Sequence, residues 1–557
     1  MHRAVMVAAV VMLHAALGAP PVVQSLFPIG GQRGTEVVAQ VSGTLDPWPL
    51  AAWADHPGIR ISPDPMKKGF YKIGLAPDTP PGPHLLRFHN AHGASSPRVF
   101  LVGTAPDLPE VEPNDAFGAA QSVTNLPVVI HGKLEKNGDV DSYKIGLKAG
   151  QTLVAAVDAF TAGSPMDALL TLRDERGSRV AFNHDAHSLD PRLIWPCRRE
   201  GVYLLQIAAF AHPASSSVGF SGGAAHVYRL TVTQGPYVSH ALPMGVTRGQ
   251  PAKVELRGWN LAPATFLDVA PTGGDEVLLG SAAVNAPLRL PARAGAHGVE
   301  TEPNDAALPA QAFTPPGSVT GCISHDGDVD RVAFRAVRGQ GLFLDLRSGR
   351  EGFLLDGRLA IEDGNGTVLA SDDDSGGRKD PQLNWTAPAD GVYFAVVTDL
   401  FNHGGPEHVY RLGIAGPEPD FSATVAAPNY VVEPGRTNDV KVTVRMSGGF
   451  GGKLWLAAAG LPAGVSALPV DISKAGEATL KLVAAVGAAP ASGEWRMELR
   501  QAEGNQTRRA TCELTSSSVD NGVPQGFPDL VIRQTDRLWI SLTPPAPAPT
   551  APPAKTP

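Results

Sequence analysis

Short runs of apolar and β-branched residues recur along the chain, each bounded by Gly, Pro, Asn or Asp. Clear examples lie at residues 36–41, 151–157, 202–208, 341–346 and 392–397. Between such runs, segments 174–177 and 363–366 have the composition of hairpin turns, because Gly and Asn tolerate positive φ. Runs and turns that recur about every 8–12 residues are typical of β-sandwiches. The pattern therefore predicts an all-β protein built from tandem β-sandwich (jelly-roll-like) and Ig-like domains.

Two long segments of the chain repeat each other at a near-constant offset. The offset is 190 residues between Glu112 and Glu302, and it is still 182 residues between His226 and His408. Within these segments the same motifs recur in the same order: Glu-x-Glu-Pro-Asn-Asp, Gly-Asp-Val-Asp, Asp-Pro, Gly-Val-Tyr and Val-Tyr-Arg-Leu. A weaker repeat precedes each copy, since residues 28–34 parallel residues 243–249. We therefore interpret the duplicated unit as a small β domain followed by a larger one.

The N-terminus has the features of a secretory signal: a positive start, an apolar run and small residues at 16–18. No later apolar run is long enough to span a membrane, which predicts a secreted, periplasmic or cell-surface protein. The C-terminus is rich in Pro, Ala and Thr, and such tails are extended. The predicted organisation is a signal peptide at 1–18, an Ig-like domain at 19–105, a β-sandwich at 108–234, a short Ig-like domain at 235–297, a second β-sandwich at 298–416, an Ig-like domain at 420–515 and a C-terminal extension at 516–557.

Charge and cysteine content narrow the class of protein. The net charge of −8 over 557 residues is mild, and the sequence has no basic block. This balance argues against nucleic acid or an anionic membrane surface as the main partner. The three cysteines do not occupy corresponding positions of the two long repeats, so the sequence predicts no repeated disulfide framework.

Carboxylate and amide side chains gather at the start of each long repeat. Alternate residues of an extended strand project to the same side, so Glu110 and Glu112 can converge. Clustered carboxylates repel one another unless a cation lies between them, and Ca²⁺ takes about six to eight oxygen ligands. The alternative is a solvated acidic turn in which Asp and Asn serve only as turn formers. The candidate calcium ligands are Glu110, Glu112, Asn114, Asp115, Asp139 and Asp141 in the first copy, and Glu300, Glu302, Asn304, Asp305, Asp328 and Asp330 in the second.

Several further motifs could be catalytic or metal-binding, but each also has a structural explanation. Residues 219–223 match Gly-x-Ser-x-Gly, but a nucleophile elbow needs a following helix, and a β-type run follows here. His184 and His187 have no histidine counterparts in the second repeat, which favours surface histidines over a metal site. The acidic loop at 372–374 is interpreted as a solvated hairpin. The recurring tyrosines are either core residues or an aromatic binding face: Tyr203, Tyr228, Tyr393 and Tyr410.

Through these motifs the long repeats resemble the bacterial pre-peptidase C-terminal domain, a β-sandwich related to the collagen-binding domains of clostridial collagenases. The resemblance covers 108–234 and 298–416 and includes the acidic loop that begins at residue 372. It implies calcium binding by the acidic start and the following Asp pair. The small domains resemble immunoglobulin-like IPT/TIG domains, and residues 420–515 resemble Ig-like domains found beside sugar-processing modules. The whole arrangement is similar to large secreted proteins of planctomycete-type bacteria.

The function predicted from the sequence is binding or spacing at the cell surface by a secreted, non-catalytic protein with calcium-stabilised sandwich modules. Its expected partner is an extracellular protein or a polysaccharide. One alternative is an accessory, targeting or inhibitory partner of a secreted protease, because domains of the resembled family trail secreted peptidases. A second alternative is a carbohydrate-binding envelope protein. An enzyme would need a nucleophile and a base, and the sequence presents no such pair.

Overall fold

The computed structural model describes residues 19–186, 188–215, 218–270, 273–280, 288–305, 311–376, 379–516 and 530–544. Over these residues the protein is all-β, which confirms the predicted fold class. The described helical elements are two 3-10 turns, η1 (Phe160–Ala162) and η2 (Gly349–Glu351). Neither is long and apolar enough to cross a membrane. The predicted signal peptide and the end of the Pro-rich tail lie outside the described residues.

The first domain, small domain 1, is a sandwich of two sheets with strand orders β1-β3-β6-β5 and β2-β9-β7-β4. Alternating residues of these strands enclose a core around Tyr71, Phe88 and Phe100, all fully buried. Its strands are β1 (Val22–Phe27), β2 (Gly30–Gln32), β3 (Glu36–Thr44), β4 (Ala51–Ala54), β5 (Ile59–Pro63), β6 (Phe70–Leu75), β7 (Gly82–Asn90), β8 (Gly93–Ala94) and β9 (Arg98–Gly103).

The second domain, sandwich 1, packs a sheet of order β10-β12-β20-β14-β17 on one of order β11-β13-β18-β15-β16. Its first strand runs parallel to β12, so the linker from small domain 1 is already part of the sheet. Its strands are β10 (Asp107–Pro109), β11 (Gln121–Val123), β12 (Val128–Lys133), β13 (Asp141–Leu147), β14 (Thr152–Asp158), β15 (Ala168–Arg173), β16 (Arg179–Asn183), β17 (Arg192–Pro196), β18 (Gly201–Ser215), β19 (Val218–Phe220) and β20 (Val227–Thr233).

The third domain, small domain 2, has two three-stranded sheets of order β21-β23-β24 and β22-β26-β25. The fourth domain, sandwich 2, repeats the strand order of sandwich 1 in both of its sheets. It begins at Ala296, two residues before the predicted start, because β27 pairs with β29. The strands of small domain 2 are β21 (Tyr237–Leu242), β22 (Val246–Thr247), β23 (Ala252–Trp259), β24 (Phe266–Val269), β25 (Glu276–Leu279) and β26 (Leu288–Arg293). Those of sandwich 2 are β27 (Ala296–Val299), β28 (Gln311–Phe313), β29 (Gly317–Cys322), β30 (Asp330–Ala336), β31 (Gly341–Arg347), β32 (Gly357–Glu362), β33 (Val368–Asp372), β34 (Gln382–Thr386), β35 (Gly391–Asp399) and β36 (Val409–Ala415).

The last, or terminal, domain extends past residue 515, where the sequence suggested only an extension. β47 pairs with β46, and the fully buried β48 pairs with both β38 and β44, so each completes a sheet. The strands are β37 (Asp420–Val425), β38 (Asn429–Val432), β39 (Thr437–Ser447), β40 (Leu454–Ala459), β41 (Val465–Ala467), β42 (Val470–Ile472), β43 (Gly476–Ala484), β44 (Ala491–Gln501), β45 (Thr507–Arg509), β46 (Thr511–Ser516), β47 (Leu530–Thr535) and β48 (Leu538–Leu542).

The repeated Asp-Pro motif fixes the same short turn in both sandwiches. The Asp190 carboxylate accepts three backbone N–H groups at η1, at 2.8–3.0 Å. The Asp380 carboxylate accepts three at η2, at 2.8–2.9 Å. Helix starts leave backbone N–H groups without intrahelical partners, and a buried carboxylate satisfies them. These aspartates are therefore structural residues.

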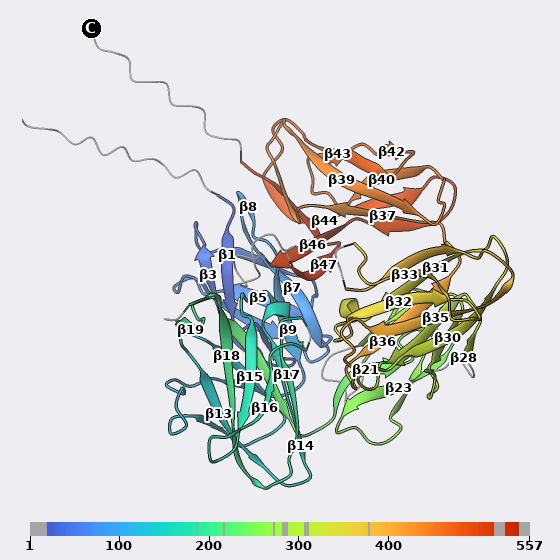
Figure 1. Cartoon of the computed structure of the whole chain (residues 1–557). Coiled ribbons are helices and arrows are strands. Elements are labelled where there is room, and N and C mark those ends of the chain that lie inside the picture. The colour runs from blue at the N-terminus through green and yellow to red at the C-terminus, as the bar shows by residue number, and fades with distance from the viewer. Residues whose placement is uncertain are drawn as a thin grey trace, which may run out of the picture.

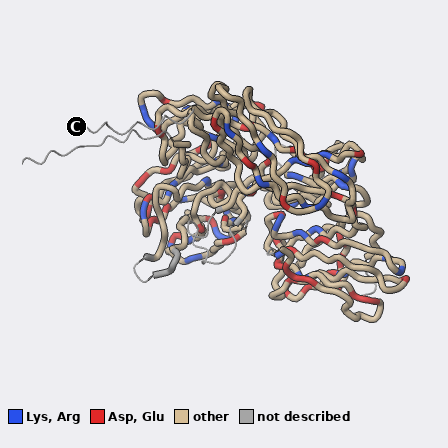
Figure 2. The backbone as a smooth tube through the Cα atoms, turned by 90° about the horizontal axis from the view of Figure 1, so that it is seen from above, with Lys and Arg blue, Asp and Glu red and all other residues tan. Residues whose placement is uncertain are grey.

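The five domains contact one another across the chain. The terminal domain lies beside small domain 1, as Figure 1 shows for β46 and β47 next to β7. Leu514 and Ile532 pack against a cluster that includes Leu85 of small domain 1 and Ala162 of sandwich 1. The two sandwiches meet through an ion pair between Arg192 and Glu407. Lys and Arg are interspersed with Asp and Glu over the described chain (Figure 2).

Candidate functional site

The acidic motif of each repeat lies where the chain crosses from one sheet of the sandwich to the other. In sandwich 1, β10 is parallel to β12 in one sheet, and β11 is parallel to β13 in the other. Residues 110–120 join β10 to β11 and therefore bridge the two sheets. Asp141 is the first residue of β13, and Tyr228 comes from the central strand β20. The topology thus places both parts of the predicted motif at one edge of the sandwich.

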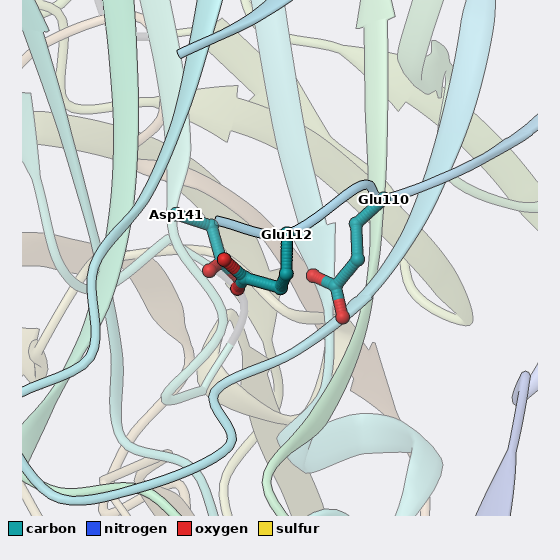
Figure 3. Close-up of side chains that lie close together, drawn as sticks. All are labelled: Glu110, Glu112 and Asp141. Atoms are coloured by element: carbon teal, nitrogen blue, oxygen red, sulfur yellow. The ribbon is translucent and has the colours of Figure 1, made fainter. Parts of the chain in front are cut away.

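Five carboxylates meet at this edge of sandwich 1. Glu110, Glu112 and Asp141 each place an oxygen within 4.8 Å of the other two. Glu112 also forms such a group with Asp115 and Asp139. Figure 3 shows the carboxylates of Glu112 and Asp141 side by side, with Glu110 directed toward them. All five carboxylates predicted from the sequence are therefore brought together in the first copy.

Sandwich 2 brings together fewer of the predicted residues. Glu300, Glu302 and Asp330 form the group that corresponds to the first triad, with oxygens within 4.8 Å of one another. Asp305 and Asp328 belong to no such group. The Asp328 carboxylate accepts the backbone N–H groups of its own loop, from Ser324 at 2.5 Å and Val329 at 2.9 Å. Asp139 accepts the corresponding N–H group in sandwich 1, from Glu135. Among the described residues, the copies therefore differ in the number of three-carboxylate groups, two in sandwich 1 and one in sandwich 2.

Two tyrosines and two glycines complete the acidic sites. The sequence analysis did not assign these four residues to the sites. The Tyr228 hydroxyl donates to Asp141 Oδ2 at 2.6 Å, and that of Tyr410 donates to Asp330 Oδ2 at 2.8 Å. Both tyrosines are fully buried, so they are core residues and not an aromatic binding face. A Cβ at Gly132 or Gly321 would overlap the Tyr hydroxyl and the carboxylate of Glu110 or Glu300. Each glycine and each tyrosine occupies the same position in both repeats, and this recurrence is the feature of the sequence that could have identified them as site residues.

Buried oxygen atoms without partners point into both sites. When the carboxyl groups are ionised, the buried Oδ1 atoms of Asp141 and Asp330 accept no hydrogen bond from any donor among the described residues. Among the described residues, Asn304 Oδ1 is also buried without a hydrogen-bond donor. The corresponding oxygen of Asn114 accepts the N–H of Ser142 at 3.2 Å. Leaving a buried acceptor unpaired costs about 1–3 kcal/mol. Hard cations such as Ca²⁺ are bound by carboxylate and amide oxygens of this kind. The side chains present therefore fit a calcium ion better than a solvated turn.

Burial makes these carboxyl groups retain protons when no cation is bound. Desolvation, and then the charge of Glu110, raises the pKa of Asp141. Desolvation raises the pKa of Glu110 as well. The same two effects raise the pKa of Asp330 beside Glu300, and desolvation raises that of Glu300. Two adjacent carboxylates cannot both ionise cheaply in a low-dielectric site. Each pair therefore holds a proton that the unfolded chain releases near pH 4.

In chelator, the protein is expected to lose stability as the pH rises from about 5 to 8. The folded state then binds protons that the unfolded state lacks, so the free energy of unfolding falls with pH, by about 1.4 kcal/mol per unit per retained proton. Thermal unfolding at both pH values measures the slope. The variants Asp141→Asn and Asp330→Asn mimic the protonated acid and should flatten it. A slope that is unchanged in both variants would place the protons elsewhere.

The other sequence motifs are satisfied locally. The Ser221 hydroxyl donates to the carbonyl of Phe210 at 2.7 Å, and a strand follows it, so the Gly-x-Ser-x-Gly match is no nucleophile elbow. Asp372 Oδ2 accepts the hydroxyl of Ser375 at 2.5 Å and the N–H of Gln382 at 2.9 Å. This loop connects β33 of one sheet to β34 of the other, so it is a crossover between the sheets and not the predicted hairpin. His184 pairs with the adjacent Asp185 at 2.9 Å. His187 lies outside the described residues.

Comparison with known proteins gives one significant curated relative. No family model matches the chain. The chain is 34% identical over 123 residues to a probable subtilase-type serine protease of Deinococcus radiodurans. The match covers 20% of this chain and 16% of that protein, so the chain spans about one sixth of its relative's length.

Two solved structures show low-scoring likenesses to the chain. One is the pre-peptidase C-terminal domain of a collagenase from Bacillus anthracis, of the family that the sequence motifs resemble. It is 16% identical, with a TM-score of 0.17 over 20% of this chain and 99% of that one. The other is a Bacteroides ovatus protein, SGBP-B of a mixed-linkage glucan utilization locus, in complex with a heptasaccharide. It is 10% identical, with a TM-score of 0.14 over 69% of this chain and 75% of that one.

Proposed function

We propose that the protein is an exported, non-catalytic binding and structural protein of the cell surface whose sandwiches are locked by calcium. The observation that carries the calcium site is the pair of bare, buried oxygens, Asp141 Oδ1 and Asp330 Oδ1. Each lies in a group of three converging carboxylates, at corresponding positions of two sandwiches. Because the site recurs at the same edge of both sandwiches, its proposed role is structural and common to both domains.

The residues of each site would divide the work of holding a cation. Glu110 and Glu112 come from the segment that enters the sandwich, whereas Asp141 comes from the opposite sheet. Tyr228 orients Asp141 by donating to its second oxygen. Glu110, Glu112 and Asp141 would hold Ca²⁺ through their oxygens, and the ion would offset two of the clustered negative charges and link the entering segment to the sandwich. The linker from the preceding small domain would then keep a fixed direction, as a surface protein that presents binding faces requires.

Calcium is expected to raise the unfolding temperature of both sandwiches in the full-length protein. A ligand at about 100 times its dissociation constant stabilises by about 2.7 kcal/mol, which is about 10 °C for a domain of this size. Scanning calorimetry in Ca²⁺ and in chelator measures the shift. Asp141→Asn should remove the shift of sandwich 1, and Asp330→Asn that of sandwich 2.

Asp374→Asn is the matched control, because it makes the same change of charge in an exposed loop of sandwich 2, between β33 and β34. It should retain the full calcium shift. The absence of a shift in the parent protein, or a shift that survives in both site variants, would rule out the calcium site.

A second candidate function is that of an accessory partner of a secreted protease. The observation in its favour is the 34% identity over 123 residues to a subtilase-type protease. Co-elution of the tagged full-length chain with an active-site-labelled serine protease would favour this candidate over a purely structural role.

A further inference from the structure

One sheet face of the terminal domain is covered at one end and open at the other. In the sheet β38-β48-β44-β40-β42, Trp539 of β48 faces outward and packs on Trp53 and His89 of small domain 1, at ring distances of 5.9 and 4.9 Å. β40 and β42 lie at the opposite end of this sheet. There Trp455 is 48% exposed, whereas the other seven tryptophans, all in the described part of the chain, are buried or half-buried.

Trp455 points outward from a regular strand. Its neighbours Leu454 and Leu456 are fully buried in the core, so the period-two alternation of the strand sends the indole to the solvent. The next outward residues along β40 are Ala457 and Ala459, whose small side chains leave the ring uncovered. Over the described residues, no aromatic ring or cation stacks on Trp455, and its indole N–H donates to no protein group. A half-exposed indole on a regular strand presents a flat apolar surface and a polar N–H to the solvent, and both are positioned to contact a ligand.

Polar residues flank the ring in register. Asp471 of β42 lies directly opposite Trp455 on one side, and Arg500 of β44 lies opposite it on the other. Neighbouring strands are about 4.8 Å apart, so the two backbones lie about 10 Å apart across the indole. This distance matches one hexose ring with the hydroxyl groups on its two edges. Asp471 can accept from a hydroxyl, and the Arg500 guanidinium can donate to one.

The charge balance of the face distinguishes between classes of ligand. Arg500 donates twice to Glu498, at 2.6 and 3.0 Å, and Arg496 donates to Glu494 at 3.2 Å. Each of these cations contacts a carboxylate, although Arg496 shares Glu494 with Arg537. Ion pairs of this kind, rather than a patch of unpaired cations, disfavour nucleic acid or an anionic polymer as the ligand. Alanines and ion pairs surround the ring, whereas protein hot spots are found in well-packed apolar pockets. A neutral sugar offers a C–H face for the indole and hydroxyls that both donate and accept.

We propose that Trp455, with Asp471 and Arg500 beside it, binds a hexose unit of a neutral polysaccharide. The indole would stack on the C–H face of the ring, Asp471 would accept a hydroxyl hydrogen, and Arg500 would donate through the N–H groups that Glu498 leaves free. The site names a ligand class for the surface-binding role proposed above and uses none of the acidic residues of the sandwiches.

Affinity electrophoresis of the full-length protein tests the proposal. Native gels would contain hydroxyethylcellulose, galactomannan or laminarin as neutral polymers, and polygalacturonate as an anionic one. At least one neutral polymer should retard the protein. Trp455→Ala should weaken that retardation about tenfold or more, the effect expected of an aromatic anchor, whereas Trp455→Phe should retain part of it. Phe266→Ala, which removes another exposed aromatic from a sheet strand, is the control and should bind like the parent.

Two results would overturn the site: retardation by none of the neutral polymers, or equal retardation of the parent and Trp455→Ala. Retardation by polygalacturonate alone would also overturn it, because it would indicate charge binding. Thermal unfolding checks that the exposed substitution leaves the fold intact. A calcium shift without retardation would overturn the sugar site and leave the calcium proposal intact. Retardation without a calcium shift would overturn the calcium proposal and leave the sugar site intact.

Discussion

Gly321→Ala is expected to destabilise sandwich 2 by about 3 kcal/mol and to abolish its calcium shift. A Cβ at this position would overlap Tyr410 Oη and Glu300 Oε2, and the fully buried Tyr410 has no room to move away. Overpacking a core costs about 1–3 kcal/mol, and separating Tyr410 from Asp330 adds the cost of an unpaired buried hydroxyl, about 1–3 kcal/mol. Scanning calorimetry and calcium titration of the full-length variant measure both effects.

Gly364→Ala is the matched control for this variant. It lies in a hairpin of the same sandwich, where an added Cβ meets no atom within 4 Å. Its effect should stay within about 0.5 kcal/mol, as for most surface substitutions. Gly132→Ala should reproduce the loss in sandwich 1, because the same overlap with Tyr228 and Glu110 occurs there. A Gly321→Ala protein that unfolds and binds calcium like the parent would show that the site can rearrange, and would remove the glycine from it.

Arg87→Ala is expected to separate the terminal domain from small domain 1. Arg87 is fully buried, with its guanidinium about 6 Å from the ring centroids of both Trp53 and Trp539. It donates to Asn429 Oδ1 and, at 2.6 Å, to the carbonyl of Arg537. Arg87→Ala leaves Asn429 Oδ1 and the carbonyl of Arg537 without this donor, which costs about 1–3 kcal/mol for each buried acceptor. Interfaces between domains of one chain are modest in area and polar, so they depend on few such contacts.

Small-angle scattering and limited proteolysis measure this separation. The radius of gyration of Arg87→Ala should rise. Protease should cut the exposed connection between β36 and β37 faster than in the parent, because undocking leaves the terminal domain free to move about it. Arg87→Lys should undock in part, since lysine retains the charge without the planar fork. Arg60→Ala, at an exposed position of β5, should behave like the parent. If Arg87→Ala scatters like the parent, the apolar cluster around Leu85 and Ile532 suffices to hold the domains together.

The end of the terminal domain shows where sequence patterns gave too short a domain. The segment from Leu530 to Leu542 has the apolar character of strands, but a Ser-, Gly- and Pro-containing stretch precedes it and a Pro-rich tail follows it. Position along the chain therefore suggested an extension. In the structure β47 and β48 complete the two sheets of the domain, and β48 is buried along its whole length. Pairing of strands distant in sequence leaves no local signal, so the boundary could not be read from the pattern.

The acidic sites show how far a repeat can carry a prediction. Recurrence identified the carboxylates, because an oxygen-rich motif kept in two copies stands out in a single sequence. It did not show that, among the described residues, Asp305 and Asp328 form no further three-carboxylate group in sandwich 2. Nor did it select Tyr410 or Gly321, since a buried tyrosine and a strand glycine have ordinary structural roles in any sheet.

The sequence by itself determined the all-β class, the duplication and the carboxylates that begin each sandwich. These features depend on local periodicity, turn composition and internal repetition, which a chain carries without being folded. Only the tertiary structure decided which carboxylates converge, that Asp141 and Asp330 keep a bare oxygen, and that the last domain docks on the first through Arg87. Those outcomes depend on contacts between residues far apart in the chain and on the exclusion of water around them, and both arise only when the sheets pack.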